Sequence, residues 1–476
     1  MQYEKVIGLE IHVRVKSVTK MFCSCKNALE LADTPNIHVC PICMGFPGML
    51  PRINKEVIHL WVVAGMMMNC EIHKVSRFDR KSYFYPDLPN SFQTTQMYEP
   101  IVWKGYIETY VWSDIRRFDI HHMHLENDAW KLSHVWWKTL CDYNRAWSPL
   151  MEIVTEPVFH EVDEVMEFLK ELQKIMRAAG VSDADMEKGQ LRCDVNISLR
   201  PMWDTKLYNR VELKNLNSFS AIGRAIETES RRQEKLLEKW EVVVQETRGW
   251  DDTTGLSTSQ RSKEDAMDYR YFPEPDILPI VLDEAFLDSC QKQVVELPIV
   301  KRRRYLEEYK LWDDDARLLT SDYPLSLFFE ELVTLTWDAK KSCSYTTSVL
   351  LALIAESEDI KNISELRFDI KELAQVIELV NKDELSSTNA KIVIEQLFIY
   401  WWETSLIVDE NNLRQKNDVW LLESIVDIVL SENASQVEEY KWGKENLFGY
   451  FVGQCMKASK WQWNPKTFTD ILKKKL

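Results

Sequence analysis

The sequence predicts an α+β domain followed by a region that is entirely helical. Three observations support this prediction. Short strands with alternating apolar and polar residues fill residues 1–290, and two amphipathic helical segments interrupt them. Residues 270–280 contain three prolines, which is typical of an extended linker. From about residue 295 onward, apolar residues recur at helical spacing.

The amphipathic segments of the first region lie at about 162–176 and 220–239. In the first, Val165, Leu169 and Leu172 follow the helical period, and Gly180 is placed to end the helix. Helical spacing later continues through 301–311, 324–335, 344–355, 371–380, 387–400 and about 410–476. We therefore expect three parts, at 1–292, 293–405 and 406–476.

Length and composition set the class of protein. The chain has 476 residues, of which 28% are charged and 45% hydrophobic, with a net charge of −16. This is a globular composition with room for two or three domains. No apolar run approaches 18 residues and residues 1–6 hold no signal core, so we expect a bacterial cytoplasmic protein without a membrane partner. All nine histidines precede residue 161, which predicts that the chemistry lies in the first domain.

Two closely spaced cysteine pairs form the strongest local motif. Cys23 and Cys25 are followed by Cys40 and Cys43. In a cytosolic chain, such pairs suit a tetrahedral structural zinc ion better than disulfides. The alternative is that they are reduced thiols without a ligand.

Five strand-like segments carry charged or amide side chains on one face. Alternation places these residues together within each strand: Glu10 and His12; Glu126 and Asp128; Glu152 and Glu156; Asp194 and Asn196; Glu212 and Lys214. The outer face of an antiparallel sheet in water alternates in the same way. Five such strands together also favour a face that holds Mg²⁺ on carboxylates and phosphates on Arg and Lys. The chain has neither a P-loop nor a dinucleotide-binding glycine motif. The mode of nucleotide binding that remains is ATP held by metal ions on a sheet face.

Two further segments are candidates for contacts with phosphate. Residues 78–87 combine charges and aromatics, including Arg80 and Lys81, and are either a packed surface loop or a loop that touches phosphate and adenosine. Residues 440–476 hold eight lysines against Glu445 and Asp470. This basic tail is either a solvated helix face or a contact with a polyanion.

Tryptophan and glycine counts are unbalanced, with 18 Trp against 13 Gly where roughly 33 Gly are usual for this length. Trp112 and the pair Trp136 and Trp137 separate strand-like runs, and Trp240 follows a helical segment. Turns and helix ends at such places favour glycine. The tryptophans therefore form either a surface on which bases stack, or positions that are glycine in the natural protein because the codon UGA, which some genetic codes translate as Trp, is there translated as Gly.

The motifs resemble, in order and along essentially the whole chain, those of the B subunits of bacterial and organellar aspartyl/glutamyl-tRNA amidotransferases. The resemblance rests on residues 4–12, 23–43, 79–87, 124–126, 142–146, 152–157, 214–218, 245–250 and 268–275. It implies a catalytic cradle similar to glutamine synthetase, then a helical domain and a helical tail domain.

The resemblance also implies an activity. In a heterotrimer with an amidase (A) and a small (C) subunit, such a chain converts misacylated Glu-tRNA(Gln) or Asp-tRNA(Asn) to the amide. ATP phosphorylates the side-chain carboxylate, and ammonia from glutamine then displaces phosphate. By resemblance, His12, Glu126 and Glu152 are Mg²⁺ ligands, with Glu10 and Asp128 beside them. The remaining residues implied to contact ATP, the acyl phosphate or ammonia are Arg80, Lys81, Asp194, Asn196 and Lys214, and the basic tail would contact tRNA rather than DNA.

Departures from the family pattern concentrate at tryptophan. The family has glycine where this chain has Trp130 and Trp147, whereas Trp250 is expected. Replacing the other seventeen Trp would bring Gly to 30. Two other functions stay open: an ATP-dependent ligase acting on a small acid, and a non-catalytic zinc-containing scaffold that binds tRNA. The sequence does not decide between the two tRNA substrates.

Overall fold

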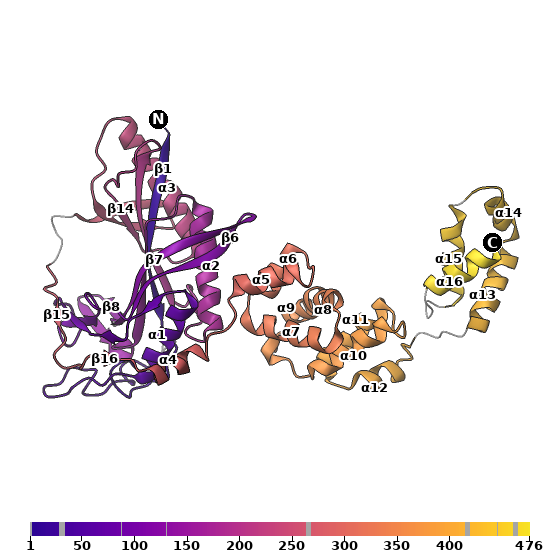
Figure 1. Cartoon of the computed structure of the whole chain (residues 1–476), viewed down its shortest axis with the longest axis horizontal. Helices are drawn as coiled ribbons and strands as arrows, with labels where there is room; N and C mark the ends of the chain where they lie inside the picture. Colours follow the sequence, from indigo (N-terminus) through magenta and orange to yellow (C-terminus); the bar gives the residue numbers. More distant parts are fainter. Residues whose placement is uncertain are drawn as a thin grey trace. The chain divides into compact units, whose positions relative to one another are not determined.

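The computed structural model describes residues 2–27, 34–86, 88–129, 131–262, 268–414, 419–444, 446–459 and 465–476 (Figure 1). The chain divides into two compact units, Met1–Lys301 and Arg302–Leu476. The first unit mixes strands and helices, and the described part of the second is helical apart from one isolated bridge, Leu385 to Arg414. The predicted change near residue 295 is therefore present, while the division into three domains stays a prediction.

A nine-stranded sheet forms the centre of the first unit. Its strands, in spatial order, are β14 (Leu256–Ser262), β13 (Glu246–Asp251), β12 (Val211–Lys214), β11 (Leu191–Pro201), β1 (Tyr3–Arg14), β10 (Pro149–Thr155), β7 (Asp114–Asn127), β6 (Val102–Val111) and β2 (Glu71–Ile72). The expected antiparallel sheet needs one correction, because β12 and β13 pair in parallel. The chain between them runs through a helix, which returns it to the same end of the sheet.

Three small sheets contain the other strands found among the described residues of this unit. They are β4 (Asp79–Ser82) between β15 (Phe272–Pro273) and β5 (Phe92–Thr95); β3 (Val75–Ser76) with β16 (Ile280–Val281); and the hairpin of β8 (Lys131–Val135) and β9 (Lys138–Asp142). Residues 270–280, predicted as a linker, thus supply strands to two of these sheets. The helices are α1 (Lys55–Met67), α2 (Val162–Ala178), α3 (Phe219–Glu238) and α4 (Glu284–Gln291), with a 3₁₀ turn at Tyr143–Arg145.

Helices α2 and α3 pack against the apolar face of the large sheet, on β6 and β11 respectively. The ring of Phe168 in α2 meets Phe118 of β7 at 6.0 Å and Phe159 at 5.0 Å between centroids. Both helices begin and end within three residues of the predicted positions, and Gly180 follows α2 with φ +68°. The opposite face of the sheet is therefore left for polar side chains.

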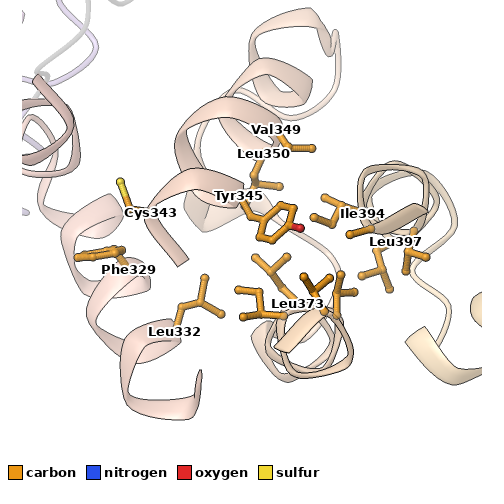
Figure 2. Packing of buried hydrophobic residues seen from close by; sticks show 14 of the residues in the cluster. Phe329, Leu332, Cys343, Tyr345, Val349, Leu350, Leu373, Ile394 and Leu397 are labelled. Atoms are coloured by element: carbon orange, nitrogen blue, oxygen red, sulfur yellow. The ribbon is translucent and has the colours of Figure 1, made fainter. Parts of the chain in front are cut away.

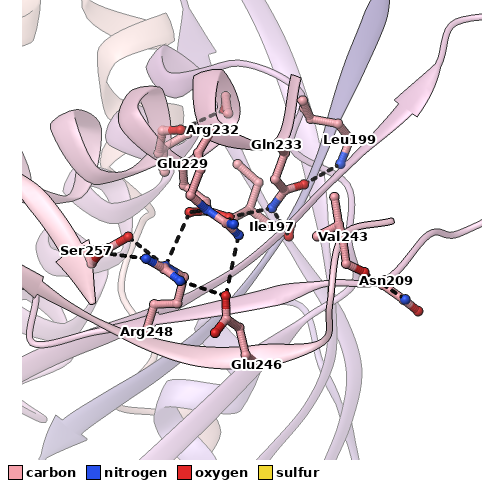
Figure 3. Close-up of polar contacts among 12 residues, drawn as sticks. Ile197, Leu199, Asn209, Glu229, Arg232, Gln233, Val243, Glu246, Arg248 and Ser257 are labelled. Atoms are coloured by element: carbon pink, nitrogen blue, oxygen red, sulfur yellow. Dashed lines mark hydrogen bonds and ion pairs between the residues drawn. The ribbon is translucent and has the colours of Figure 1, made fainter. Parts of the chain in front are cut away.

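A buried polar network fixes α3 to the edge of β11 (Figure 3). Gln233 donates to the carbonyl of Ile197 at 3.2 Å and accepts from the amide of Leu199 at 3.1 Å, next to the place where pairing with β12 stops. Buried Glu229 accepts from Arg232 and lies 3.8 Å from Arg248. Because each buried polar group has a partner, the network holds β11 in place without leaving a buried charge unpaired.

The second unit is built from helices around two apolar clusters. Its helices are α5 (Pro298–Glu307, which begins in the first unit), α6 (Asp313–Leu319), α7 (Tyr323–Thr336), α8 (Ala339–Tyr345), a π-helical turn (Thr346–Leu350), α9 (Leu351–Glu356), α10 (Ile370–Asn381), α11 (Ser387–Tyr400), α12 (Thr404–Glu410), α13 (Val419–Glu432), α14 (Ala434–Lys441), α15 (Leu447–Ala458) and α16 (Pro465–Lys475), with a 3₁₀ turn at Ile363–Glu365.

The larger cluster joins α7, α8, α10 and α11 (Figure 2). Its members include Phe329, Leu332, Tyr345, Leu373, Ile394 and Leu397. The smaller cluster joins α13, α15 and α16 around Leu422, Phe451 and Phe468. No helix in the described ranges is both long and apolar enough to cross a membrane.

Candidate active site

The polar face of the large sheet brings together side chains from three neighbouring strands. His12 of β1 pairs in register with Glu152 of β10, which pairs with His124 of β7. A β-bulge makes this alignment possible, because His121 is an extra residue in β7 between Ile120 and His122. The extra residue turns His124 and Glu126 toward the polar face, while Met123 and Leu125 stay buried.

His12, Glu126 and Glu152 form a compact cluster. The Nε2 atom of His12 lies 3.6 Å from Oε1 of Glu126 and 3.3 Å from Oε2 of Glu152. One ligand atom from each residue lies within 4.8 Å of the others. One imidazole nitrogen and two carboxylate oxygens at this spacing can hold a divalent cation.

The electrostatics of the cluster match a site built for a cation. Burial disfavours the imidazolium, but the hydrogen bond and charge of Glu152, with the charge of Glu126, raise the pKa of His12 to about 9. Burial and the neighbouring Glu152 raise the pKa of Glu126. Although burial opposes its ionisation, His124 and His12 hold the pKa of Glu152 well below its usual range. A bound cation would replace the proton that these groups share.

A cavity of about 460 Å³ opens beside the cluster, and its lining includes His12, Glu126, Asp194 and Lys214. Lys214 donates to Asp194 at 2.8 Å and lies 3.0 Å from Glu212. Lys81 belongs to β4, outside the large sheet; burial would lower its pKa, but Glu126 and Glu152 raise it. Two lysines therefore stand near the carboxylates, with charges suited to an anionic ligand.

Three other predicted residues, Glu10, Asn196 and Asp128, lie near the cluster but form hydrogen bonds or ion pairs with residues outside it. Glu10 accepts from the amide of Asn196 at 2.9 Å, and both line a smaller cavity of about 140 Å³. Buried Asp128 lies 3.0 Å from Arg145 and also lines the larger cavity.

Arg80 is not brought to the cluster. Its guanidinium binds both carboxylate oxygens of Glu274 at 2.7 and 2.8 Å and stacks on Phe92. It lines a separate cavity of about 280 Å³, whose wall includes Trp147. Arg80 and Lys81 are successive residues of β4, so their side chains point to opposite faces of its small sheet, and only Lys81 is directed toward the cluster.

His124 had no predicted role, yet the structure places it in the site. Its Nε2 atom lies 3.3 Å from Oε2 of Glu152 and 4.0 Å from Oε2 of Glu126. The signal was available, since His124 and Glu126 are two residues apart on one strand. The bulge that turns this segment toward the cluster has no comparable signal in the sequence.

The four cysteines form a second cluster. The sulfur atoms of Cys23, Cys25, Cys40 and Cys43 all lie within 4.8 Å of one another. The thiol of Cys23 and the ammonium of Lys20, 3.8 Å away, help to lower the pKa of Cys43 to about 5, against the effect of burial. Four converging sulfur atoms, one of them favoured as the thiolate, could hold a metal ion.

The fold and the two clusters define the class of protein: an α+β protein with a histidine–carboxylate cluster on a sheet face, lysines beside it and a cysteine cluster, each cluster able to hold a metal ion. Comparison with known families narrows this class. Residues 5–288 match the GatB/GatE catalytic domain, and residues 327–476 match the GatB domain. The chain belongs to the GatB/GatE family.

Its relatives share its full length. The chain is 43% identical over 477 residues to the B subunit of the aspartyl/glutamyl-tRNA(Asn/Gln) amidotransferase of Persephonella marina, covering 100% of both chains. It is 42% identical to the corresponding B subunits of Caldicellulosiruptor bescii and Lachnoclostridium phytofermentans, covering all of this chain and 99% of each relative. The resemblance stated from the motifs is thereby confirmed.

Proposed function

We propose that this chain is the B subunit of an amidotransferase that converts Glu-tRNA(Gln), Asp-tRNA(Asn) or both to Gln-tRNA(Gln) and Asn-tRNA(Asn). ATP would phosphorylate the side-chain carboxylate, and ammonia released from glutamine by an amidase (A) subunit would displace the phosphate. A small (C) subunit would complete the heterotrimer. The observation that carries the proposal is the cluster of His12, Glu126 and Glu152 in a chain that matches such B subunits from end to end.

The chemistry explains why such residues are needed. A carboxylate is a poor acyl donor until one oxygen becomes part of a phosphate leaving group. Phosphoryl transfer needs positioning and charge neutralisation more than covalent help from the protein. In this proposal His12, Glu126 and Glu152 hold Mg²⁺, which supplies that neutralisation, and Lys81 and Lys214 orient the phosphates.

The remaining assignments follow the same logic. Asp194 orients Lys214 through its hydrogen bond, and Glu10, Asn196 and Asp128 line the cavities through which the acyl phosphate and ammonia approach. Arg80 lies in β4 and not in the loop that the sequence predicts for residues 78–87. It pairs with Glu274 and so holds β4 beside β15 rather than contacting ATP at the cluster. The cysteine cluster holds structural Zn²⁺. The lysines of residues 440–476 contact the tRNA backbone, because polyanion binding needs clustered positive charge.

The test is a transamidation assay on the chain co-expressed with its amidase and small subunits. Glu126→Gln should abolish amide formation and tRNA-dependent ATP hydrolysis while leaving the assembly intact. The matched control is Glu108→Gln, which removes a half-buried carboxylate from β6, outside the cluster, and should keep activity. Amide formation on free glutamate or aspartate without tRNA would favour a small-acid ligase. Full activity in Glu126→Gln would favour a non-catalytic scaffold.

A further inference from the structure

Six tryptophans have a left-handed backbone. They are Trp112, Trp136, Trp147, Trp240, Trp337 and Trp401, with φ between +55° and +63°. Among the described residues, six glycines and ten other residues adopt positive φ as well, and four of those ten are asparagines, which tolerate this conformation better than other residues with a β-carbon. For an L-residue with a β-carbon this conformation is sterically strained, and for a bulky residue it is a genuine outlier. The backbone at these positions is one that glycine adopts without strain.

Two of the six begin two-residue hairpin loops. Trp112 follows β6 and precedes Ser113 and β7, and Trp136 lies between β8 and β9. The favoured hairpin turns need positive φ at the first loop residue, whatever the second adopts. The twist of the paired strands therefore imposes this conformation. The indole of Trp112 donates to Asp163 at 3.0 Å, but this contact leaves the strain of the backbone in place.

Three others end helices. The amide of Trp240 donates to the carbonyl of Leu237 after α3. Trp337 and Trp401 end α7 and α11 and donate to the carbonyl four residues earlier. This is the helix end at which glycine in the left-handed conformation is most common.

Packing offers no compensation at the clearest positions. The side chains of Trp136, Trp240 and Trp337 are 91%, 88% and 90% exposed. An aromatic surface for stacking bases would explain the exposure, but it would not require left-handed backbone at chain reversals.

We propose that the protein made in its own cells carries glycine at these six positions, because UGA codons there are translated as glycine. The distribution of strain agrees with the deficit of glycine and with the family pattern at position 147. Trp250 is the contrasting case: it is buried, its backbone is unstrained, and its indole donates to Asp252 at 3.0 Å.

Position 147 gives the proposal a functional consequence. Trp147 follows Arg145, the partner of Asp128, and lies two residues before β10, which carries Glu152. Trp147 is 4% exposed, and the centroid of its ring lies 5.6 Å from that of Phe22. The residue also forms part of the wall of the cavity that Arg80 lines. Glycine would remove this wall and relax the segment that leads into β10.

The direct experiment is peptide mass spectrometry on the protein purified from its source organism, with sequencing of the gene. Peptides covering the six positions should each lack the mass of the indole side chain, and their codons should be UGA. The peptide covering residue 250 should retain tryptophan and serves as the control. Tryptophan in the six peptides, or UGG codons at those positions, overturns the proposal.

A second experiment tests position 147 and rests on the proposed function. The recombinant assembly with Trp147→Gly should form amide from misacylated tRNA roughly tenfold faster or more than the assembly with Trp147, since small displacements near reacting groups cost this much. Trp337→Gly, far along the chain from the cluster, should leave the rate unchanged. An unchanged rate in Trp147→Gly contradicts the functional consequence, while the peptide masses still decide the residue identity.

Discussion

The strain at helix ends predicts that removing one exposed indole makes the protein more stable. We choose Trp337→Gly, because Trp337 ends α7 at φ +55° and its side chain is 90% exposed. Release of the left-handed strain should contribute roughly 1–2 kcal/mol. The greater conformational freedom of glycine in the unfolded chain should offset about 0.5–1 kcal/mol of this stabilisation. The net gain is roughly 0.75 kcal/mol at the middle of these ranges, which raises the Tm of a unit of this size by roughly 2–3 °C.

Two controls separate the backbone from the side chain. Trp337→Ala removes the same indole but keeps a β-carbon in the left-handed conformation, so it should give no comparable gain. Trp442→Gly removes an indole that is 89% exposed at the end of α14, where φ is −84°. With no strain to release, it should lower stability by about 0.5–1 kcal/mol.

Thermal unfolding followed by circular dichroism measures all three variants. A lower Tm for Trp337→Gly would refute the reasoning. An equal rise for Trp337→Ala would also refute it, since the gain would then come from losing an exposed aromatic side chain and not from the backbone.

Three further predictions concern the metal clusters. His124→Asn should weaken Mg²⁺ binding roughly 10–100-fold, because Glu152 loses the partner that orients it. Calorimetry measures the affinity, with His134→Asn in the β8–β9 hairpin as the control. If His124→Asn binds Mg²⁺ as tightly as the unmodified protein, His124 does not orient Glu152. Because the pKa of His12 is about 9, Mg²⁺ competes with a proton for His12 below that pH. The apparent affinity for Mg²⁺ should therefore rise up to about tenfold from pH 7 to pH 8 and level off near pH 9. A pH-independent affinity would exclude His12 as a ligand. Cys23→Ser should remove bound zinc and lower the Tm, whereas Cys141→Ser should do neither; metal analysis of the purified assembly decides, and zinc retained in Cys23→Ser would count against the cysteine site.

Much of the site was predictable because strand periodicity is local. Alternation alone places Glu10 with His12 and Glu126 with Asp128 on shared faces. The contacts between side chains of different strands could not be predicted from alternation within one strand. That Glu152 stands between His12 and His124, while Arg80 binds Glu274, depends on register and on the bulge at His121. Trp130, Trp461 and Trp463 lie outside the described residues, so the glycine interpretation there rests on the sequence alone.

The α+β class, the change to helices near residue 295 and the cysteine motif could be read from the sequence, because each depends on spacing along the chain. The family could be read from the resemblance of motifs in order, whereas a cradle similar to glutamine synthetase stays a prediction. The tertiary structure decided which polar residues meet. Residues 12, 126 and 152 are far apart in sequence, and only the pairing of β1, β10 and β7 brings their ligand atoms within 4.8 Å. It also decided which tryptophans are strained, since the sign of φ at Trp337 or Trp442 depends on how each helix ends and not on residue type.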